Sequence, residues 1–152
     1  MSEEQANIEL INFRFNTVQI ISKRVAEMQP EILNKPFNFQ ITVEIKVQRP
    51  SKLVIAYVYA KILFEGNPES VADFTVACGF QIDEFEEYIK TNEAGISIVP
   101  QPFDELIRPI SISTARGVIY SDLRGTYLQN AIMPVIFMNQ FKAISKEDIP
   151  KS

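Results

Sequence analysis

The sequence contains no histidine, and it has only one cysteine among its 152 residues. Without histidine the chain lacks Ser-His and Cys-His nucleophile pairs, histidine metal ligands and imidazole acid or base chemistry. The single Cys78 excludes an intramolecular disulfide and a cysteine-rich zinc site within one chain. The glycine-rich signatures GxGxxG and GxxxxGK(S/T) are also missing, which excludes the common phosphate-binding loops. We therefore expect no bound metal and no cofactor.

Positively charged residues are in the minority, because the chain has 15 Lys and Arg residues and 19 Asp and Glu residues. An acidic chain repels phosphate groups, so nucleic acid is not an expected partner. The N-terminal residues MSEEQANIEL have neither the basic region nor the apolar core of a signal peptide. The apolar run from Leu53 to Ala60 is far shorter than the roughly 20 residues that span a bilayer. These features predict a cytoplasmic protein without membrane insertion.

Hydrophobic residues make up 46% of the chain and charged residues 22%, which is typical of a folded globular protein. A chain of this length is expected to form one domain and to bury roughly 70% of its unfolded surface. We expect residues 1–152 to be that domain, with residues 1–10 and 143–152 as flexible ends.

The remaining groups with catalytic potential are carboxylates, which cluster in the segment IDEFEEYIK as Asp83, Glu84, Glu86 and Glu87. One interpretation is an acid–base pair or a cation site. The other is the solvated face of a short helix, or its acidic start. The base rate for charge runs favours the second interpretation.

The first half of the sequence predicts four strands. Residues 36–48, PFNFQITVEIKVQ, alternate strictly between apolar and polar side chains, which is typical of a long, half-buried strand. Residues 53–65 are apolar on both faces, which predicts a central strand covered on both sides. Residues 70–82 predict a third strand, and residues 12–28 another, with a bulge between Phe15 and Val18 where the alternation slips. The short turns between the strands indicate an antiparallel meander.

The second half changes to helical spacing. Proline is favoured in the first turn of a helix, so we expect the main helix to begin near Ile107 or Pro109. It is expected to end near residue 123 or 124, with Gly125 as its C-terminal cap. Gly117 lies inside it, which suggests the close approach of another backbone. The fold class is therefore α+β, with the sheet first and the helix after it.

Residues 124–141, RGTYLQNAIMPVIFMNQF, form an apolar segment that Gly125 and Pro134 interrupt. Arg124-Gly125, the aromatic Tyr127, the aliphatic Ile132, and Pro134-Val135 followed by Phe137 match without a gap the end of the main helix and the next loop in the SecB family of export chaperones. Thr114-Ala115-Arg116 and Ser121-Asp122-Leu123 also look like the helix of that family. The order of elements agrees from about Phe13 to Phe141. The chain differs at Leu128 and Ile136, and around residues 83–94, and so resembles a divergent relative.

This resemblance implies a four-stranded antiparallel sheet followed by a long helix, an apolar loop and a short C-terminal helix. It also implies an ATP-independent chaperone, not an enzyme, that holds unfolded or pre-secretory polypeptides in hydrophobic grooves during protein export. The implied partners are these polypeptides and the translocase motor SecA. The implied assembly is a homotetramer, a dimer of dimers.

The interrupted segment has the character expected of a client site, because exposed apolar and flexible side chains bind without sequence specificity. The candidate client-binding residues are Tyr127, Leu128, Ile132, Met133, Val135, Phe137 and Met138. Each of them could instead belong to the core of the chain. The small side chains Ser113, Ala115 and Gly117 are candidates for an oligomer interface or for ordinary packing within the chain.

Two alternatives remain open at this point. The same grooves would serve a SecB-like chaperone dedicated to one client, such as the antitoxin of a toxin–antitoxin system. A closed cavity with paired acids near Asp83 would instead favour an enzyme or a small-ligand binder.

Overall fold

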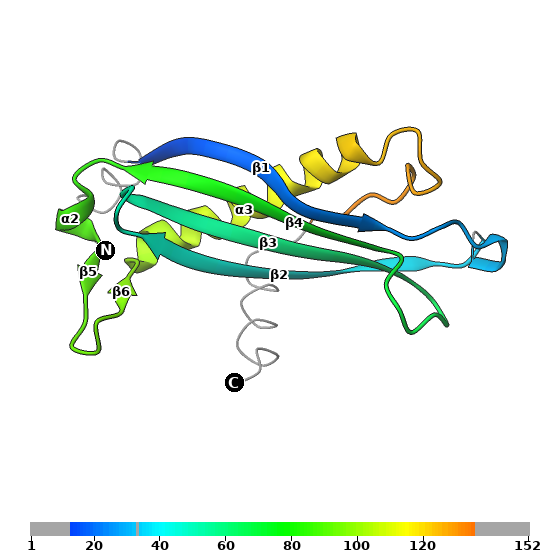
Figure 1. Cartoon of the computed structure of the whole chain (residues 1–152), viewed down its shortest axis with the longest axis horizontal. Helices are drawn as coiled ribbons and strands as arrows, with labels where there is room; N and C mark the ends of the chain where they lie inside the picture. The colour runs from blue at the N-terminus through cyan, green and yellow to red at the C-terminus, as the bar shows by residue number, and fades with distance from the viewer. Residues whose placement is uncertain (1–12, 33, 136–152) are drawn as a thin grey trace.

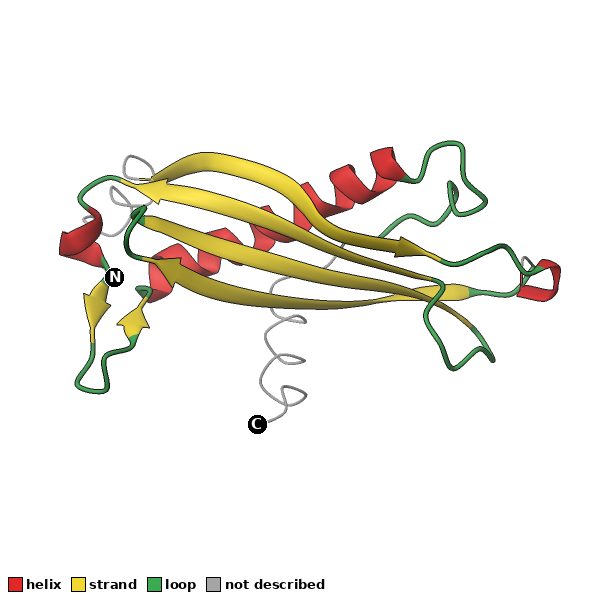
Figure 2. Ribbon diagram, viewed as in Figure 1, coloured by secondary structure: helices red, strands yellow, loops and turns green. Residues whose placement is uncertain are grey.

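The computed structural model describes residues 13–32 and 34–135, and it contains one four-stranded antiparallel sheet with a long helix on one face (Figures 1 and 2). The sheet consists of β1 (Phe13–Val25), β2 (Phe37–Gln48), β3 (Leu53–Phe64) and β4 (Ala72–Ile82), and the helix is α3 (Gln101–Asp122). This arrangement confirms the predicted α+β class. Both predicted flexible ends, residues 1–10 and 143–152, lie outside the described residues, and no C-terminal helix follows α3 in the described part of the chain, which stops at residue 135.

The strand order in the sheet is β1-β4-β3-β2. Strands β2, β3 and β4 form the predicted meander, whereas β1 lies beside β4, so the full sheet departs from a simple meander. The register of β1 against β4 shifts between Phe15 and Thr17 and again between Ile20 and Ser22. The first shift confirms the predicted bulge, and the second was not predicted. Strands β1 and β2 are the two edges of the sheet.

The β2–β3 hairpin is regular over its whole length, from the pair Phe37–Phe64 to the pair Gln48–Leu53. Its four-residue loop closes with a hydrogen bond from the amide of Lys52 to the carbonyl of Arg49 (3.0 Å). Lys52 adopts a φ of 58°, in the left-handed region, which lets the chain reverse without a bulge in either strand. The hairpin therefore holds β2 in one register against β3.

The core lies between α3 and the inner face of the sheet. Alternate residues of β3 that point toward α3 are fully buried, among them Val54, Ala56 and Val58. Tyr57 and Tyr59 on the opposite face are half-buried, because no element among the described residues covers that face. The expectation that β3 is covered on both sides is therefore wrong for the described part of the chain. On this outer face the hydroxyl of Tyr59 donates a hydrogen bond to Glu44 (2.9 Å), and the ammonium of Lys46 lies 5.5 Å from the centroid of the Tyr57 ring.

Helix α3 begins at Gln101, one and a half turns or more before the predicted start, and Pro109 lies inside it. An internal proline destabilises a helix by about 3 kcal/mol. Burial of Phe103 and Ile107, at roughly 2 kcal/mol for each side chain, offsets this penalty and extends the helix toward its N-terminus. The end at Asp122 is within two residues of the prediction. The C-cap is Leu123 and not the predicted Gly125, which adopts a φ of 82° two residues further on. None of the described helices has the length and apolar character needed to cross a membrane.

Between β4 and α3 the chain forms a small projection of α2 (Phe85–Tyr88), β5 (Lys90–Thr91) and β6 (Ser97–Ile98) at one end of the sheet (Figure 1). Arg49, in the β2–β3 loop, anchors this projection. Its guanidinium donates hydrogen bonds to the carbonyl of Ile89 (2.9 Å) and to the hydroxyls of Thr91 (2.7 Å) and Ser97 (2.9 Å). A two-stranded hairpin of this size is marginal by itself, so its position depends on this arginine.

Candidate polypeptide-binding surface

The single helix is narrower than the sheet that it covers. Helix α3 packs mainly against the two central strands, β3 and β4. The inner faces of the edge strands are therefore only partly covered, although their side chains are apolar. On β2, Phe37 remains 38% exposed and Phe39 and Ile41 are half-buried; on β1, Phe15 remains 47% exposed and Val18 40%. The molecule thus carries an apolar strip along each side of α3.

We call the strip of Phe37, Phe39 and Ile41 the β2 flank. Its phenylalanine rings are in contact, with the centroid of Phe37 lying 6.1 Å from that of Phe39 and 5.9 Å from that of Phe64. These contacts fix the rings in position while leaving part of Phe37 in solvent. A rigid, partly exposed aromatic side chain gains contact area with a partner at little cost in conformational entropy.

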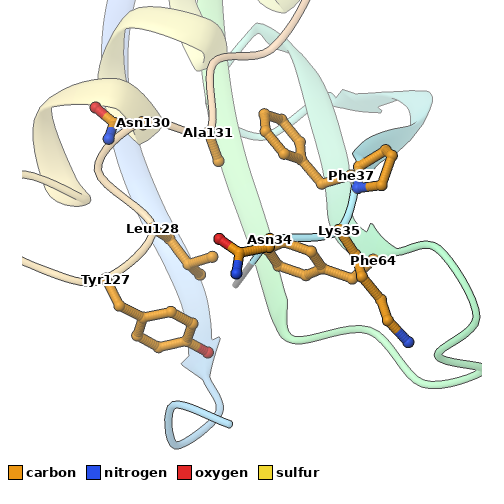
Figure 3. Close-up of a pocket in the computed structure, with 9 residues that line it drawn as sticks. Asn34, Lys35, Phe37, Phe64, Tyr127, Leu128, Asn130 and Ala131 are labelled. Atoms are coloured by element: carbon orange, nitrogen blue, oxygen red, sulfur yellow. The ribbon is translucent and has the colours of Figure 1, made fainter. Parts of the chain in front are cut away.

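A cavity of about 560 Å³ lies at the Phe37 end of the β2 flank (Figure 3). Tyr127 and Leu128 line one side of it, and Phe37 and Phe64 line the other. The rest of its lining comes from Asn34, Lys35, Pro36, Asn130 and Ala131. Apolar walls with a few amide groups are typical of sites that accept a side chain together with its peptide backbone. The lining contains no carboxylate, so the paired acids that would favour an enzyme are not in this cavity.

The loop after α3 holds the far wall of the cavity in place. The hydroxyl of Tyr127 donates a hydrogen bond to the carbonyl of Ala26 (2.7 Å), which ties this loop to the end of β1. Partial burial raises the pKa of Tyr127, with the charge of Arg24 opposing it, so the phenol remains a donor at neutral pH. Within the loop, the amide of Leu128 donates to the hydroxyl of Thr126 (3.1 Å). Both sides of the cavity are therefore preorganised.

The structure places the predicted client-binding residues in three different environments. Tyr127 is half-buried at the cavity, whereas Leu128 and Met133 are almost fully buried in the core. Ile132 and Val135 are exposed, at 53% and 65%. Phe137 and Met138 lie outside the described residues. Only Tyr127 and Leu128 contribute to the cavity, and the client-binding assignment as a whole stays a prediction.

Phe37, Phe64, Asn34 and Asn130 line the cavity but are not among the site residues that the sequence predicts. The strict alternation of residues 36–48 was the available signal, because it already placed Phe37 and Phe39 on the inner face. What the alternation could not give is the width of the covering helix. That width decides whether inner-face residues on an edge strand are buried or remain partly in solvent.

The second strip, which we call the β1 flank, consists of Phe15, Val18 and Ile20. Beside it lies an open depression lined by Ile20 and by the α3 residues Ser113, Thr114, Gly117, Val118, Ser121 and Asp122. Of the predicted interface residues, Ser113 and Gly117 are exposed here, whereas Ala115 is fully buried against the sheet. Apart from its chain neighbours and the adjacent backbone of α3, a Cβ atom on Gly117 would meet no described atom within 4 Å. The expected close approach of another backbone to Gly117 is therefore absent within the described residues.

Two carboxylates of the acidic segment around residues 83–87 form ion pairs with arginine side chains. Asp83 accepts hydrogen bonds from Arg14 (3.0 Å), and Glu86 forms an ion pair with Arg49 (2.9 Å). A hydrogen bond and charge repulsion from Glu87 raise the pKa of Glu84, the residue immediately before α2. No group of His, Cys, Asp or Glu residues in the described ranges has the arrangement of a metal site. The interpretation as the solvated face of a short helix agrees with this geometry.

No protein-family model matches the sequence, and no curated protein matches it. Six chains of solved structures match the fold. One is the SecB-like chaperone Rv1957 of Mycobacterium tuberculosis, in complex with a ChAD peptide from the HigA1 antitoxin (Rv1956). The superposition has a TM-score of 0.53 and covers 88% of this chain and 99% of that chain, at 9% sequence identity. The likeness at this identity establishes a divergent SecB-like fold.

Proposed function

We propose that this protein is an ATP-independent chaperone that binds extended, unfolded polypeptide along the β2 flank and in the cavity at its Phe37 end. The observation that carries the proposal is the uncovered inner face of β2. Rigid, partly exposed aromatic side chains lie there beside a cavity of about 560 Å³. Apolar burial at roughly 25 cal/mol per Å² supplies affinity for many sequences, because it requires no specific polar pattern.

Two further observations support a binding protein over an enzyme. The cavity lining has one charged group, Lys35, and no acid–base pair. Burial raises the pKa of the single thiol, Cys78, against the effect of Ser111, so this cysteine is a poor nucleophile. The proposed activity therefore depends on surface complementarity alone.

The range of clients separates two forms of the proposal. A general holdase, with a role in protein export and with SecA as a partner, would bind many unfolded chains. A dedicated chaperone would bind one client, such as an antitoxin. One solved structure with a similar fold is a chaperone in complex with an antitoxin peptide. This likeness supports keeping the dedicated form as a second candidate.

The test is light scattering from a chemically unfolded, unrelated protein that is diluted into buffer with and without this chain, in the absence of nucleotide. Suppressed aggregation at a near-stoichiometric ratio supports the general holdase, and purified SecA is then added to test for a ternary complex. Unchanged aggregation refutes the general form. The dedicated form would then require a natural partner that co-purifies with the chain.

The residues chosen for substitution follow from burial. Met133 is only 3% exposed, so an aspartate at this position would place a charge in the core. Such a variant would report on folding and not on client binding. Phe37 and Tyr127 are better positions, because both face the cavity and both keep some solvent contact.

A further inference from the structure

The free edge of β2 is a second feature of the proposed site, distinct from its apolar side chains. Within the described part of the chain, β2 pairs with β3 on one side and with no strand on the other. Its register against β3 is uninterrupted for twelve residues. An edge with a regular register offers unpaired amide and carbonyl groups to an extended chain.

The hydrogen bonding of the hairpin identifies the groups that point to this edge. The amide of Glu65 donates to the carbonyl of Pro36 (2.8 Å), so even-numbered residues of β2 direct their backbone groups toward β3. The backbone groups of the odd-numbered residues then point to the free edge. A contact of Arg108 supports this assignment. Its Nη1 donates a hydrogen bond to the carbonyl of Val43 (3.3 Å), an odd-numbered residue whose carbonyl is therefore not used by β3.

Arg108 divides the edge near the midpoint of β2. Asp104 holds the guanidinium, accepting hydrogen bonds from Nε (2.7 Å) and Nη2 (3.4 Å). The contact occupies the carbonyl of Val43 and leaves the edge groups of Phe37, Phe39 and Ile41 as one unobstructed stretch. This stretch, which spans roughly 17 Å, ends beside the cavity at Phe37.

The edge of β1 differs in two respects. Its register against β4 shifts twice, which breaks its free edge into short pieces. It also carries Arg14, Lys23 and Arg24, whereas the stretch of β2 from Phe37 to Ile41 has no charged side chain; charged side chains on an edge disfavour further pairing. The regular edge of β2 is therefore the better template for strand addition.

We propose that an extended client segment adds as a strand to the free edge of β2 from Phe37 to Ile41 and stops at Arg108. Backbone hydrogen bonds would supply affinity without sequence specificity. Alternate client side chains would lie over the β2 flank and enter the cavity, while the others lie beside Asn38 and Gln40 on the polar face. The preferred segment therefore has apolar residues at every second position. This inference rests on the proposed function and specifies how the same site binds the backbone and side chains of its client.

A second copy of the chain fits this edge less well. Two-fold pairing of β2 with itself along its whole length would meet Arg108 at the middle of the strand, so self-pairing would be confined to the stretch from Phe37 to Ile41. A stable protein interface also involves about 20–30 residues on each side, whereas the unobstructed stretch has five. A short extended peptide matches this stretch, and a symmetric dimer does not.

The test compares Ile41→Pro with Ile41→Ala in the full chain. Both variants remove the side chain from the β2 flank, but only proline removes the edge-facing amide, and it leaves the β2–β3 ladder intact. The probe is a fluorescein-labelled, reduced and carboxymethylated lactalbumin, which stays unfolded, and the readout is fluorescence anisotropy. We expect binding to Ile41→Pro to be at least roughly tenfold weaker than binding to Ile41→Ala.

The matched control is the pair Val25→Pro and Val25→Ala on the edge of β1. The amide of Ala26 donates to the carbonyl of Val71 (2.8 Å), so the amide of Val25 faces the free edge of β1. This pair should bind the probe equally. Circular dichroism and thermal unfolding check that all four variants are folded.

If a proline variant fails to fold, amide hydrogen exchange of the unsubstituted chain, measured with and without the probe, tests strand addition without any substitution. Saturating probe should slow exchange at Phe37, Phe39 and Ile41. Equal affinities of the two Ile41 variants, or a bound probe without this protection, would overturn strand addition while leaving the holdase proposal in place. Absence of any probe binding to the unsubstituted chain would overturn both strand addition and the general-holdase form of the proposed function.

Discussion

Replacing Phe37 by alanine tests the β2 flank with a magnitude that follows from the structure. A phenylalanine side chain has about 200 Å² of surface. Because Phe37 is 38% exposed, about 75 Å² of it is available to a client. At 25 cal/mol per Å² this area contributes about 2 kcal/mol, or roughly thirtyfold in the dissociation constant of an unfolded client.

The same substitution lowers stability, because about three-fifths of the Phe37 side chain is buried against Phe39 and Phe64. That buried area contributes up to about 3 kcal/mol to the free energy of unfolding. Urea unfolding therefore accompanies the binding assay, and affinities are compared at a temperature at which both proteins are folded.

The assay is fluorescence anisotropy with the labelled, unfolded lactalbumin probe. Ile98→Ala is the control, because Ile98 is also half-exposed at 49% but lies in the small projection at one end of the sheet. The control should leave the dissociation constant unchanged. A Phe37→Ala variant that is folded and binds within twofold of the unsubstituted chain would refute the assignment of the site to the β2 flank.

Three further predictions concern the contacts that hold the site and its surroundings. Tyr127→Phe removes the hydrogen bond to the carbonyl of Ala26 and should lower the free energy of unfolding by about 1 kcal/mol, measured by urea unfolding; Tyr57→Phe, whose hydroxyl has no described partner, should change it little. Arg49→Met removes the hydrogen bonds to Ile89, Thr91 and Ser97, so amide exchange in β5 and β6 should accelerate while exchange in β2–β4 stays slow; equal acceleration throughout would mean that Arg49 does not act locally. Partial burial opposes the charge on Asp73, but hydrogen bonds from Ser70 and Arg24 and the charges of Arg24 and Lys61 outweigh it and lower the pKa of this carboxyl. Its contribution to stability is therefore present above the ordinary aspartate pKa of 3.8 and is lost as the pH falls toward the lower folded value, so Asp73→Asn should flatten the acid limb of a stability–pH curve.

The strands could be predicted from the sequence because side-chain alternation determines both their existence and their orientation. Residues 36–48 show this most clearly, since the predicted strand and β2 differ by one residue. The pairing of β1 with β4 could not be predicted in this way. Alternation says which face of a strand is buried, but it does not say which strand lies beside it.

The start of α3 shows how tertiary packing overrides a local signal. Pro109 is a favourable first-turn residue, and the sequence therefore predicted a start near it. The buried side chains of Phe103 and Ile107 extend the helix by about two turns, and Pro102 occupies the first turn that was assigned to Pro109.

The candidate site was predicted only in part for the same reason. The apolar character of residues 124–141 drew attention to the loop after the helix, and Tyr127 and Leu128 do line the cavity. Apolar character does not distinguish buried Met133 from exposed Ile132, one residue away. The β2 flank depends on the width of α3 relative to the sheet, and a single sequence does not encode that width in any local pattern.

Site-specific photo-cross-linking tests the central claim most directly. A benzophenone amino acid is placed at Asn34, on the exposed rim of the cavity, and in a second variant at Glu93, an exposed residue between β5 and β6. Each variant is irradiated with the unfolded lactalbumin probe and, separately, with native lactalbumin. We expect a cross-link from position 34 to the unfolded probe alone, and none from position 93. Equal cross-linking from both positions, or to the native protein as well, would contradict the assignment of this cavity as a site for unfolded polypeptide.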